Sequence, residues 1–150
     1  MNYYYNLHDK NRQKNVENRM SAAKASTATL TNRYMNITGG DYASNIYESN
    51  MTEEHRSLLS RWRLSCLDLA IETGRYTDTP AELRLCSLCN VVEDENHVLF
   101  ICSRYTGIRQ RFKDLFVKCK NVKEILNPKT FELAKMAGLC IQLIEKLRKN

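Results

Sequence analysis

Four residues between positions 86 and 102 have the types and the spacing of a metal site. The pattern is Cys86-x2-Cys89-x7-His97-x4-Cys102. Two cysteines separated by two residues suit one tight turn that directs both thiolates at a single ion, and the His and third Cys can complete a tetrahedron. A catalytic zinc keeps one position free, so a full Cys3His set predicts a structural zinc ion. The simpler alternative is four buried residues without a metal.

The other three cysteines, Cys66, Cys119 and Cys140, fall on apolar helical stripes and are interpreted as small core residues. Cys119 follows the cluster closely in sequence, so it is the one that could substitute as a ligand. The first twenty residues contain no apolar run, which excludes a secretory signal peptide, and no apolar stretch approaches the ~18 residues of a membrane span. We therefore expect an intracellular protein, nuclear or cytoplasmic, with reduced cysteines.

Signatures of catalysis are missing from the sequence. It contains no glycine-rich phosphate loop, no G-x-S-x-G elbow and no H-E-x-x-H motif. Glu93, Asp94 and Glu95 could suggest acid–base or Mg²⁺ chemistry, but three adjacent acids without partner acids are typical of a solvated loop tip. We expect no enzymatic activity and no small-molecule substrate.

The elements that position the cluster are predicted to be helices. Thr52 is a suitable N-cap, because Glu53 and Glu54 follow in the first turn. A stripe of residues at helical spacing continues to a stop at Gly74; it comprises His55, Leu58, Leu59, Trp62, Cys66, Leu69 and Ala70. Residues 97–102 (HVLFIC) are rich in β-branched and aromatic side chains, which predicts a short strand after the Cys86–Asn90 knuckle.

Two further helices are predicted after the cluster. Ser103 is a candidate cap for a helix that extends to Cys119, and Asn127 followed by Pro128 predicts the start of a third helix. The expected fold is therefore mainly α: a domain at 51–150 of about three helices, with a Cys3His zinc knuckle or short β-hairpin between the first two. Residues 1–50 hold nine Asn and few large apolar residues, so we expect a disordered polar leader.

The net charge of +6 is unevenly distributed along the chain. Residues 51–102 carry five basic and nine acidic groups, whereas residues 103–150 carry twelve basic and four acidic groups. A basic surface favours an acidic partner, and RNA or DNA is the first candidate. The candidate contacts follow the cluster: Arg104, Arg109, Arg111, Lys113, Lys118 and Lys120. Tyr105 or Phe112 could stack on a base if exposed, and an ordinary solvated face is the alternative.

Residues 60–112 resemble the zinc-binding region that lies C-terminal to the polymerase in reverse transcriptases of LINE-type (non-LTR) retrotransposons. The matching residues are Arg61, Arg63, Leu69, Ile71, Glu72, Gly74, Arg75, Pro80, Arg84, Cys86, Cys89, Glu93, Asp94, His97, Leu99, Cys102, Tyr105 and Arg109. The sequence departs from the pattern at Ser65, where the family often has Gly, at Leu67, where a His is common nearby, and at Ser103, where Pro is usual.

The resemblance implies a bound zinc ion and assistance in binding template RNA or target DNA. It implies no polymerase activity, because residues 1–50 hold nothing like the paired-aspartate motif, and we expect a fragment or a co-opted remnant of such an element. Two other possibilities stay open. One is a structural or protein-interaction domain, or a remnant without function. The other is an enzyme fragment that works only beside a polymerase chain.

Overall fold

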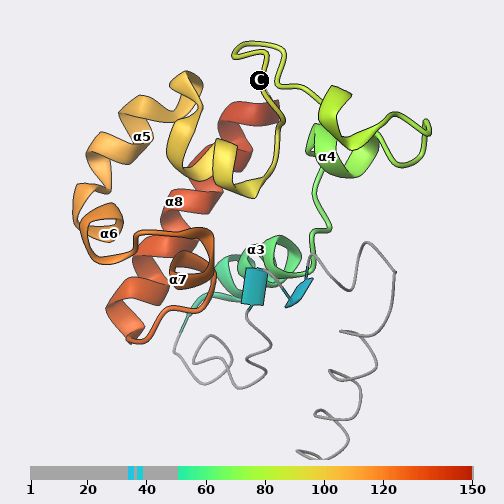
Figure 1. Ribbon diagram of the computed structural model, residues 1–150. Helices are drawn as coiled ribbons and strands as arrows, with labels where there is room; N and C mark the ends of the chain where they lie inside the picture. Colours follow the sequence, from blue (N-terminus) through green and yellow to red (C-terminus); the bar gives the residue numbers. More distant parts are fainter. Residues whose placement is uncertain (1–33, 36, 39–50, 150) are drawn as a thin grey trace, which may run out of the picture.

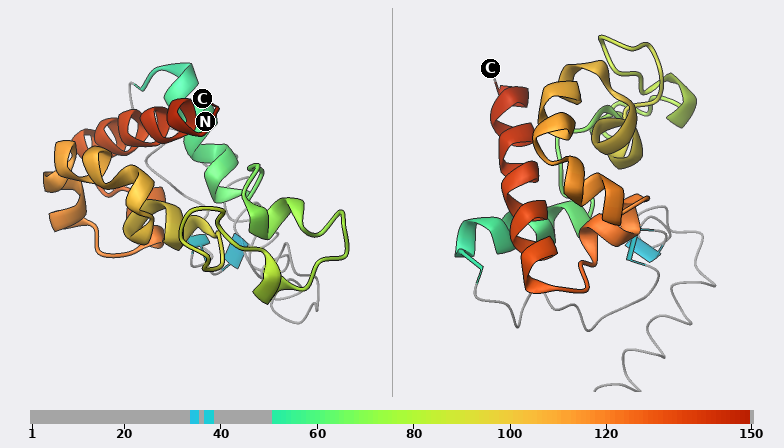
Figure 2. Two further views of the ribbon diagram at one scale, coloured as in Figure 1. Left: turned by 90° about the horizontal axis from the view of Figure 1, so that it is seen from above. Right: turned by 90° about the vertical axis from the view of Figure 1, so that its left-hand side faces the viewer.

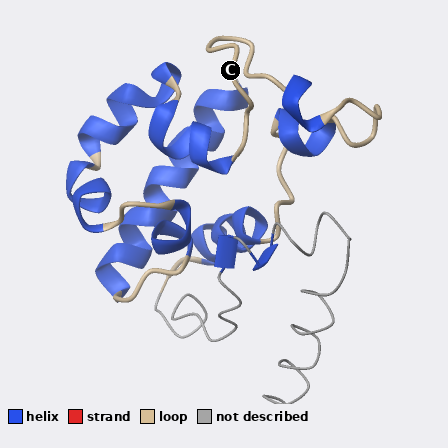
Figure 3. Ribbon diagram, viewed as in Figure 1, coloured by secondary structure: helices blue, strands red, loops and turns tan. Residues whose placement is uncertain are grey.

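The computed structural model describes residues 34–35, 37–38 and 51–149. Within these residues the protein is mainly helical, as the sequence predicts, and Figure 3 colours none of them as strand. Most of the leader expected at 1–50 lies outside the described residues, although Ile37 is buried and belongs to the core. In the described part of the chain, no helix combines the length and the apolar character needed to cross a bilayer.

The C-terminal helix α8 (Phe131–Lys149) is the element against which most of the others pack. Its buried side includes Ala137, Ile141 and Ile144. Figures 1 and 2 show that α3 (Glu53–Arg63) crosses α8. The helices in contact with α8 are α3 (Glu53–Arg63), α5 (Thr106–Arg111), α6 (Lys113–Lys118) and α7 (Val122–Leu126).

The contact between α3 and α8 forms the centre of the core. Leu59 and Trp62 of α3 are fully buried, and the Trp62 indole N–H donates to Glu145 Oε1 at 3.1 Å. Gly138 lets the two helices approach closely, because a Cβ at this position would lie 2.7 Å from His55 Cβ. Burial of large apolar side chains, at about 1.5–3 kcal/mol each, is therefore the main stabilisation of this part of the molecule.

The first helix begins as predicted and ends earlier than predicted. Thr52 Oγ1 accepts the His55 N–H at 3.3 Å, but α3 stops at Arg63, well before Gly74. The chain is turned by Ser65, whose φ is +52°, with hydrogen bonds from Ser65 N to Trp62 O (3.3 Å) and from Cys66 N to Arg61 O (2.9 Å). These two bonds are those of a Schellman motif, which usually has Gly at the left-handed position. A serine there gave no stop signal in the sequence.

A short helix and a 3-10 turn connect α3 to the cysteine-rich segment. They are α4 (Ala70–Thr73), which ends at Gly74, and η1 (Ala81–Leu83). Arg84 folds back over Gly74, where a Cβ would lie 2.6 Å from its side chain, and its guanidinium donates to Thr79 O (2.8 Å) and Ile71 O (2.7 Å). Gly74 is therefore required for the close approach of Arg84.

The helices after the cluster are shorter than predicted. The second expected helix is divided into η3 (Ser103–Tyr105), α5 and α6, with a break at Phe112. The third begins at Phe131, so the predicted start at Asn127 and Pro128 was wrong. Asn127 instead ends α7 and accepts a 2.6 Å hydrogen bond from the buried Arg63, a partner 64 residues away that local sequence cannot reveal.

Candidate metal centre

The first two cysteines of the pattern lie in a tight turn, as predicted. Cys86 N donates to Val91 O at 2.8 Å, and Asn90 N donates to Cys86 O at 2.9 Å. Asn90 has a φ of +55°, a conformation that Asn tolerates better than most residues. Beside the turn, Leu85 and Val92 form an isolated antiparallel bridge. The turn therefore presents the side chains of Cys86 and Cys89 from one side.

The other two candidate ligands lie at the two ends of a helical turn, so the strand predicted at 97–102 was wrong. Residues His97–Ile101 form a π-helical turn, η2, in which Cys102 N donates to His97 O at 2.7 Å. In an α-helix, residues five apart point about 140° away from each other, because each residue adds 100°. The wider π turn, with its i→i+5 bond, brings such residues onto the same side. The segment is apolar because its Val98 and Leu99 side chains are buried in the core.

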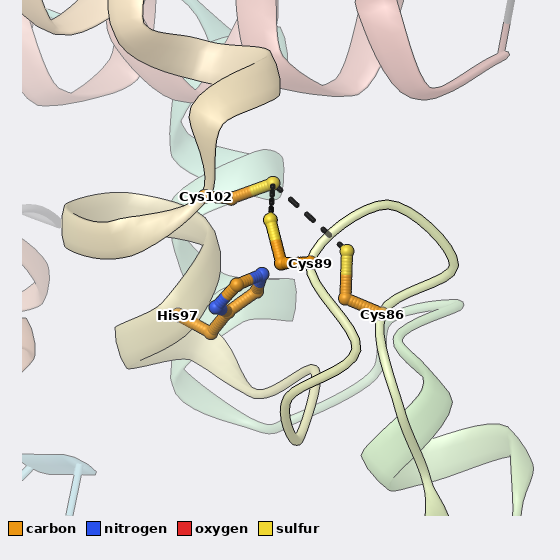
Figure 4. A group of neighbouring side chains, drawn as sticks. All are labelled: Cys86, Cys89, His97 and Cys102. Atoms are coloured by element: carbon orange, nitrogen blue, oxygen red, sulfur yellow. Dashed lines mark hydrogen bonds between the residues drawn. The ribbon is translucent and has the colours of Figure 1, made fainter.

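The four side chains converge on one point (Figure 4). One ligand atom from each of Cys86, Cys89, His97 and Cys102 lies within 4.8 Å of all the others. Cys102 Sγ is 4.0 Å from Cys86 Sγ and 3.7 Å from Cys89 Sγ. Sulfur atoms of a tetrahedral zinc site with Zn–S bonds of about 2.3 Å lie about 3.8 Å apart. The observed spacing therefore suits a tetrahedral ion of this size.

Among the four clustered side chains, His97 most clearly lacks a hydrogen-bond partner. Its side chain is only 2% exposed, and neither ring nitrogen has a hydrogen-bond partner among the described residues. A buried polar group without a hydrogen bond typically costs about 1–3 kcal/mol. A metal ion bound to one of these nitrogens would remove the cost at that nitrogen, whereas the alternative without a metal would leave both nitrogens unpaired.

The thiols of the group differ in their acidity. Burial raises the pKa of Cys102 to about 11, with the neighbouring Cys89 acting in the same direction. The backbone N–H and the hydroxyl of Ser103 lower the pKa of Cys89. Metal ligation requires thiolates, so a bound cation would have to displace the Cys102 proton. Metal affinity would therefore decrease as the pH is lowered.

The acidic triplet Glu93–Glu95 is not the solvated tip that the sequence predicts. Glu93 Oε2 accepts the N–H of Ala70 at the start of α4 (2.8 Å), and Asp94 Oδ1 accepts the N–H of His97 (2.7 Å). Glu95 is buried, and its Oε1 accepts the hydroxyl of Ser65 (3.1 Å) at the end of α3. Each carboxylate therefore fixes a different part of the chain around the ligands.

The remaining cysteines lie outside the group. Cys119 and Cys140 are buried, as predicted, and among the described residues Cys119 does not join the four clustered ligands. Cys66 is exposed, which corrects the prediction of a core position: α3 has already ended, and Cys66 lies in the turn that follows it.

The basic residues predicted to contact nucleic acid are mostly exposed. Arg104, Arg111, Lys113, Lys118 and Lys120 all lie at the surface of η3, α5, α6 and the loop that follows. Arg109 differs from them, because its guanidinium donates to Cys102 O at 2.6 Å and to Thr106 Oγ1 at 3.1 Å.

The two aromatic residues considered for base stacking are not freely available. Tyr105 is buried, and Phe112 is half-buried, with the Arg111 guanidinium 5.9 Å from its ring centroid. The exposed surface of α5 and α6 therefore carries several basic residues and one exposed apolar residue, Val117. The chain matches no protein-family model, no curated protein and no solved structure.

Proposed function

We propose that this chain is a zinc-stabilised nucleic-acid-binding module. The observation that supports the proposal best is the convergence of three sulfur atoms and an unpartnered, buried imidazole within 4.8 Å. The resemblance of residues 60–112 to the zinc-binding region of LINE-type reverse transcriptases points to the same chemistry and to an origin in such an element.

Zinc is the metal that suits this donor set best. Three thiolates and an imidazole at tetrahedral spacing form a closed set, which is typical of structural zinc and leaves no position for a reactive water. In this proposal the Cys86–Cys89 turn and the Leu85–Val92 bridge form a zinc knuckle, and the π turn supplies the two other ligands. The ion has a structural task and no catalytic one.

The metal would act on binding through the position of the basic helices. Cys102 directly precedes η3 and α5, and Tyr105 N donates to Cys102 O at 3.2 Å. Arg109 of α5 donates to the same carbonyl. A fixed Cys102 therefore fixes the start of the segment that carries the exposed arginines and lysines.

The electrostatics favour the helices over the knuckle as the contact surface. Three thiolates with one Zn²⁺ carry a charge of about −1, and the preceding segment exposes Asp68, Asp78 and Glu82. Lysine and arginine neutralise phosphates with the release of counterions, which makes such binding salt-dependent and largely independent of sequence. We propose contacts to the nucleic-acid backbone from Arg104, Arg111, Lys113, Lys118 and Lys120.

An electrophoretic shift assay with RNA and duplex DNA tests this function. Arg111→Glu combined with Lys118→Glu should weaken binding uniformly across sequences and make it less dependent on salt. The matched control is Lys135→Glu with Lys146→Glu, which makes the same charge change at two exposed residues of α8. Equal losses in both double variants would indicate only a response to net charge. Unchanged binding by the first variant would contradict the assignment.

A protein-interaction domain is the second candidate, and exposed apolar residues favour it. The connector and knuckle expose Tyr76 (91%), Leu83 (61%), Leu88 (56%) and Val91. Exposed apolar side chains that gather in a patch mark interaction sites. Absence of any shift with RNA or DNA at low salt, for protein with its metal bound, would favour this candidate.

A further inference from the structure

The last turn of α8 carries an arginine that reaches the cysteine-rich segment. Arg148 Nη1 pairs with Glu93 Oε1 at 2.9 Å, and its Nη2 donates to Asp68 O at 2.8 Å. The Arg148 side chain is only 14% exposed. Arg148 therefore joins segments 55 and 80 residues away in the sequence.

The partners of Arg148 lie on both sides of the π turn that supplies two ligands. Glu93 lies between Cys89 and His97, and it also accepts the Ala70 N–H. Beyond the turn, Tyr105 is buried three residues after Cys102, and the charge of Arg148 lies close enough to its phenol to oppose the pKa increase that burial causes. One guanidinium thus contacts the chain before His97 and lies near Tyr105, after Cys102.

We infer that Arg148, through Glu93, is a positioning residue that holds the His97–Cys102 ligand pair against the Cys86–Cys89 turn. The inference rests on the proposed metal site and adds to it the residues that set its affinity. A largely buried ion pair with a branched guanidinium fixes direction as well as distance, which a single ammonium group cannot do. Residues that orient ligands from outside the first shell typically change metal affinity by about 10–100-fold.

Titration of the metal-free full-length chain with Co²⁺ tests the inference, because tetrahedral thiolate sites give intense visible absorption bands. Arg148→Gln should weaken Co²⁺ binding about tenfold and reduce the intensity of these bands, with Arg148→Lys intermediate. Glu93→Gln should have a similar effect. The double variant should lose clearly less than the sum of the two single losses, because the Arg148–Glu93 contact is already lost in each single variant.

Two controls separate positioning from general damage to the fold. Lys149→Gln removes the neighbouring exposed charge, and Ile144→Val destabilises the same helix through its buried side. Both should keep the affinity and the spectrum of the unmodified chain. Unchanged Co²⁺ affinity in Arg148→Gln, or additive losses in the double variant, would overturn the inference and leave the metal site intact. Absence of Co²⁺ binding by the unmodified chain would reject the metal site and the inference together.

Discussion

The helical part and the cysteine-rich segment of this molecule are held together by different chemistry. Around α3, α7 and α8 the core is mainly apolar, and its Leu59, Trp62 and Ile141 are fully buried. Between Leu85 and Cys102 the chain forms one bridge and two turns around three cysteines and a histidine. The first region can be stabilised by burial alone, whereas we propose that the second needs a metal ion at its four candidate ligands in addition to its buried Val98 and Leu99.

The largest effect should come from removing one ligand. Cys102→Ser should unfold residues 85–105 locally, because binding of a structural zinc ion contributes about 10–16 kcal/mol in small domains. Hydrogen exchange measured by mass spectrometry should show loss of protection in this segment, with α3 and α8 less affected. Cys66→Ser is the control, since Cys66 is exposed and outside the group. Equal hydrogen-exchange protection of residues 85–105 in both variants would contradict the proposed difference between the two regions.

A core substitution should give the opposite pattern. Ile141→Ala removes a fully buried side chain of α8 and should lower the free energy of unfolding by about 2–5 kcal/mol. Chemical denaturation followed by circular dichroism measures the loss. One metal ion per folded chain should remain, because Ile141 is not one of the four candidate ligands. Loss of metal from the folded variant would show that the two regions do not behave separately.

Two glycine substitutions sharpen the account of the helical part. Gly138→Ala places a Cβ 2.7 Å from His55 Cβ, and we expect a loss of about 1–3 kcal/mol despite better helix propensity. Gly107→Ala in α5 has no atom within 4 Å of the new Cβ, so it should gain up to about 1 kcal/mol. Thermal melts of both variants compare the signs directly. A gain at position 138 would contradict the close packing of α3 on α8.

A buried thiol of the core should make stability depend on pH only under alkaline conditions. Burial raises the pKa of Cys140 from its ordinary 9.0 to about 12. Between these values the unfolded chain has lost a proton that the folded chain keeps, so the free energy of unfolding falls as the pH rises from about 9 to about 12. Cys140→Ala should flatten this dependence in denaturation measured across the range. Identical slopes in both proteins would contradict the burial of this thiol.

The sequence allowed the clustering of Cys86, Cys89, His97 and Cys102 to be predicted, because ligands of one ion occur at restricted spacing. The sequence did not reveal the backbone conformation between these residues. His97–Cys102 has the composition of a strand, but the π turn is selected by the burial of Val98 and Leu99 and by the i→i+5 bond. The contacts of Glu93 and Glu95 were missed for a related reason, since their partners lie 55 and 30 residues away.

The helix boundaries show which signals were informative. Thr52 was a correct N-cap because its hydroxyl contact is local. Ser65 ends α3 without the usual glycine. Asn127 resembles an N-cap in the sequence, but its side-chain oxygen accepts a hydrogen bond from Arg63. Helix α7 was missed although Asn121 and Glu124 give a capping-box pattern: Asn121 Oδ1 accepts the Glu124 N–H at 2.9 Å.

We propose that one zinc ion organises the cysteine-rich segment. Native mass spectrometry of the purified full-length chain tests it most directly, because it counts ions per folded molecule. The account predicts one Zn²⁺ per chain, and none in Cys102→Ser. A metal-free chain whose circular dichroism and hydrogen-exchange protection are unchanged by added zinc or chelator would contradict it.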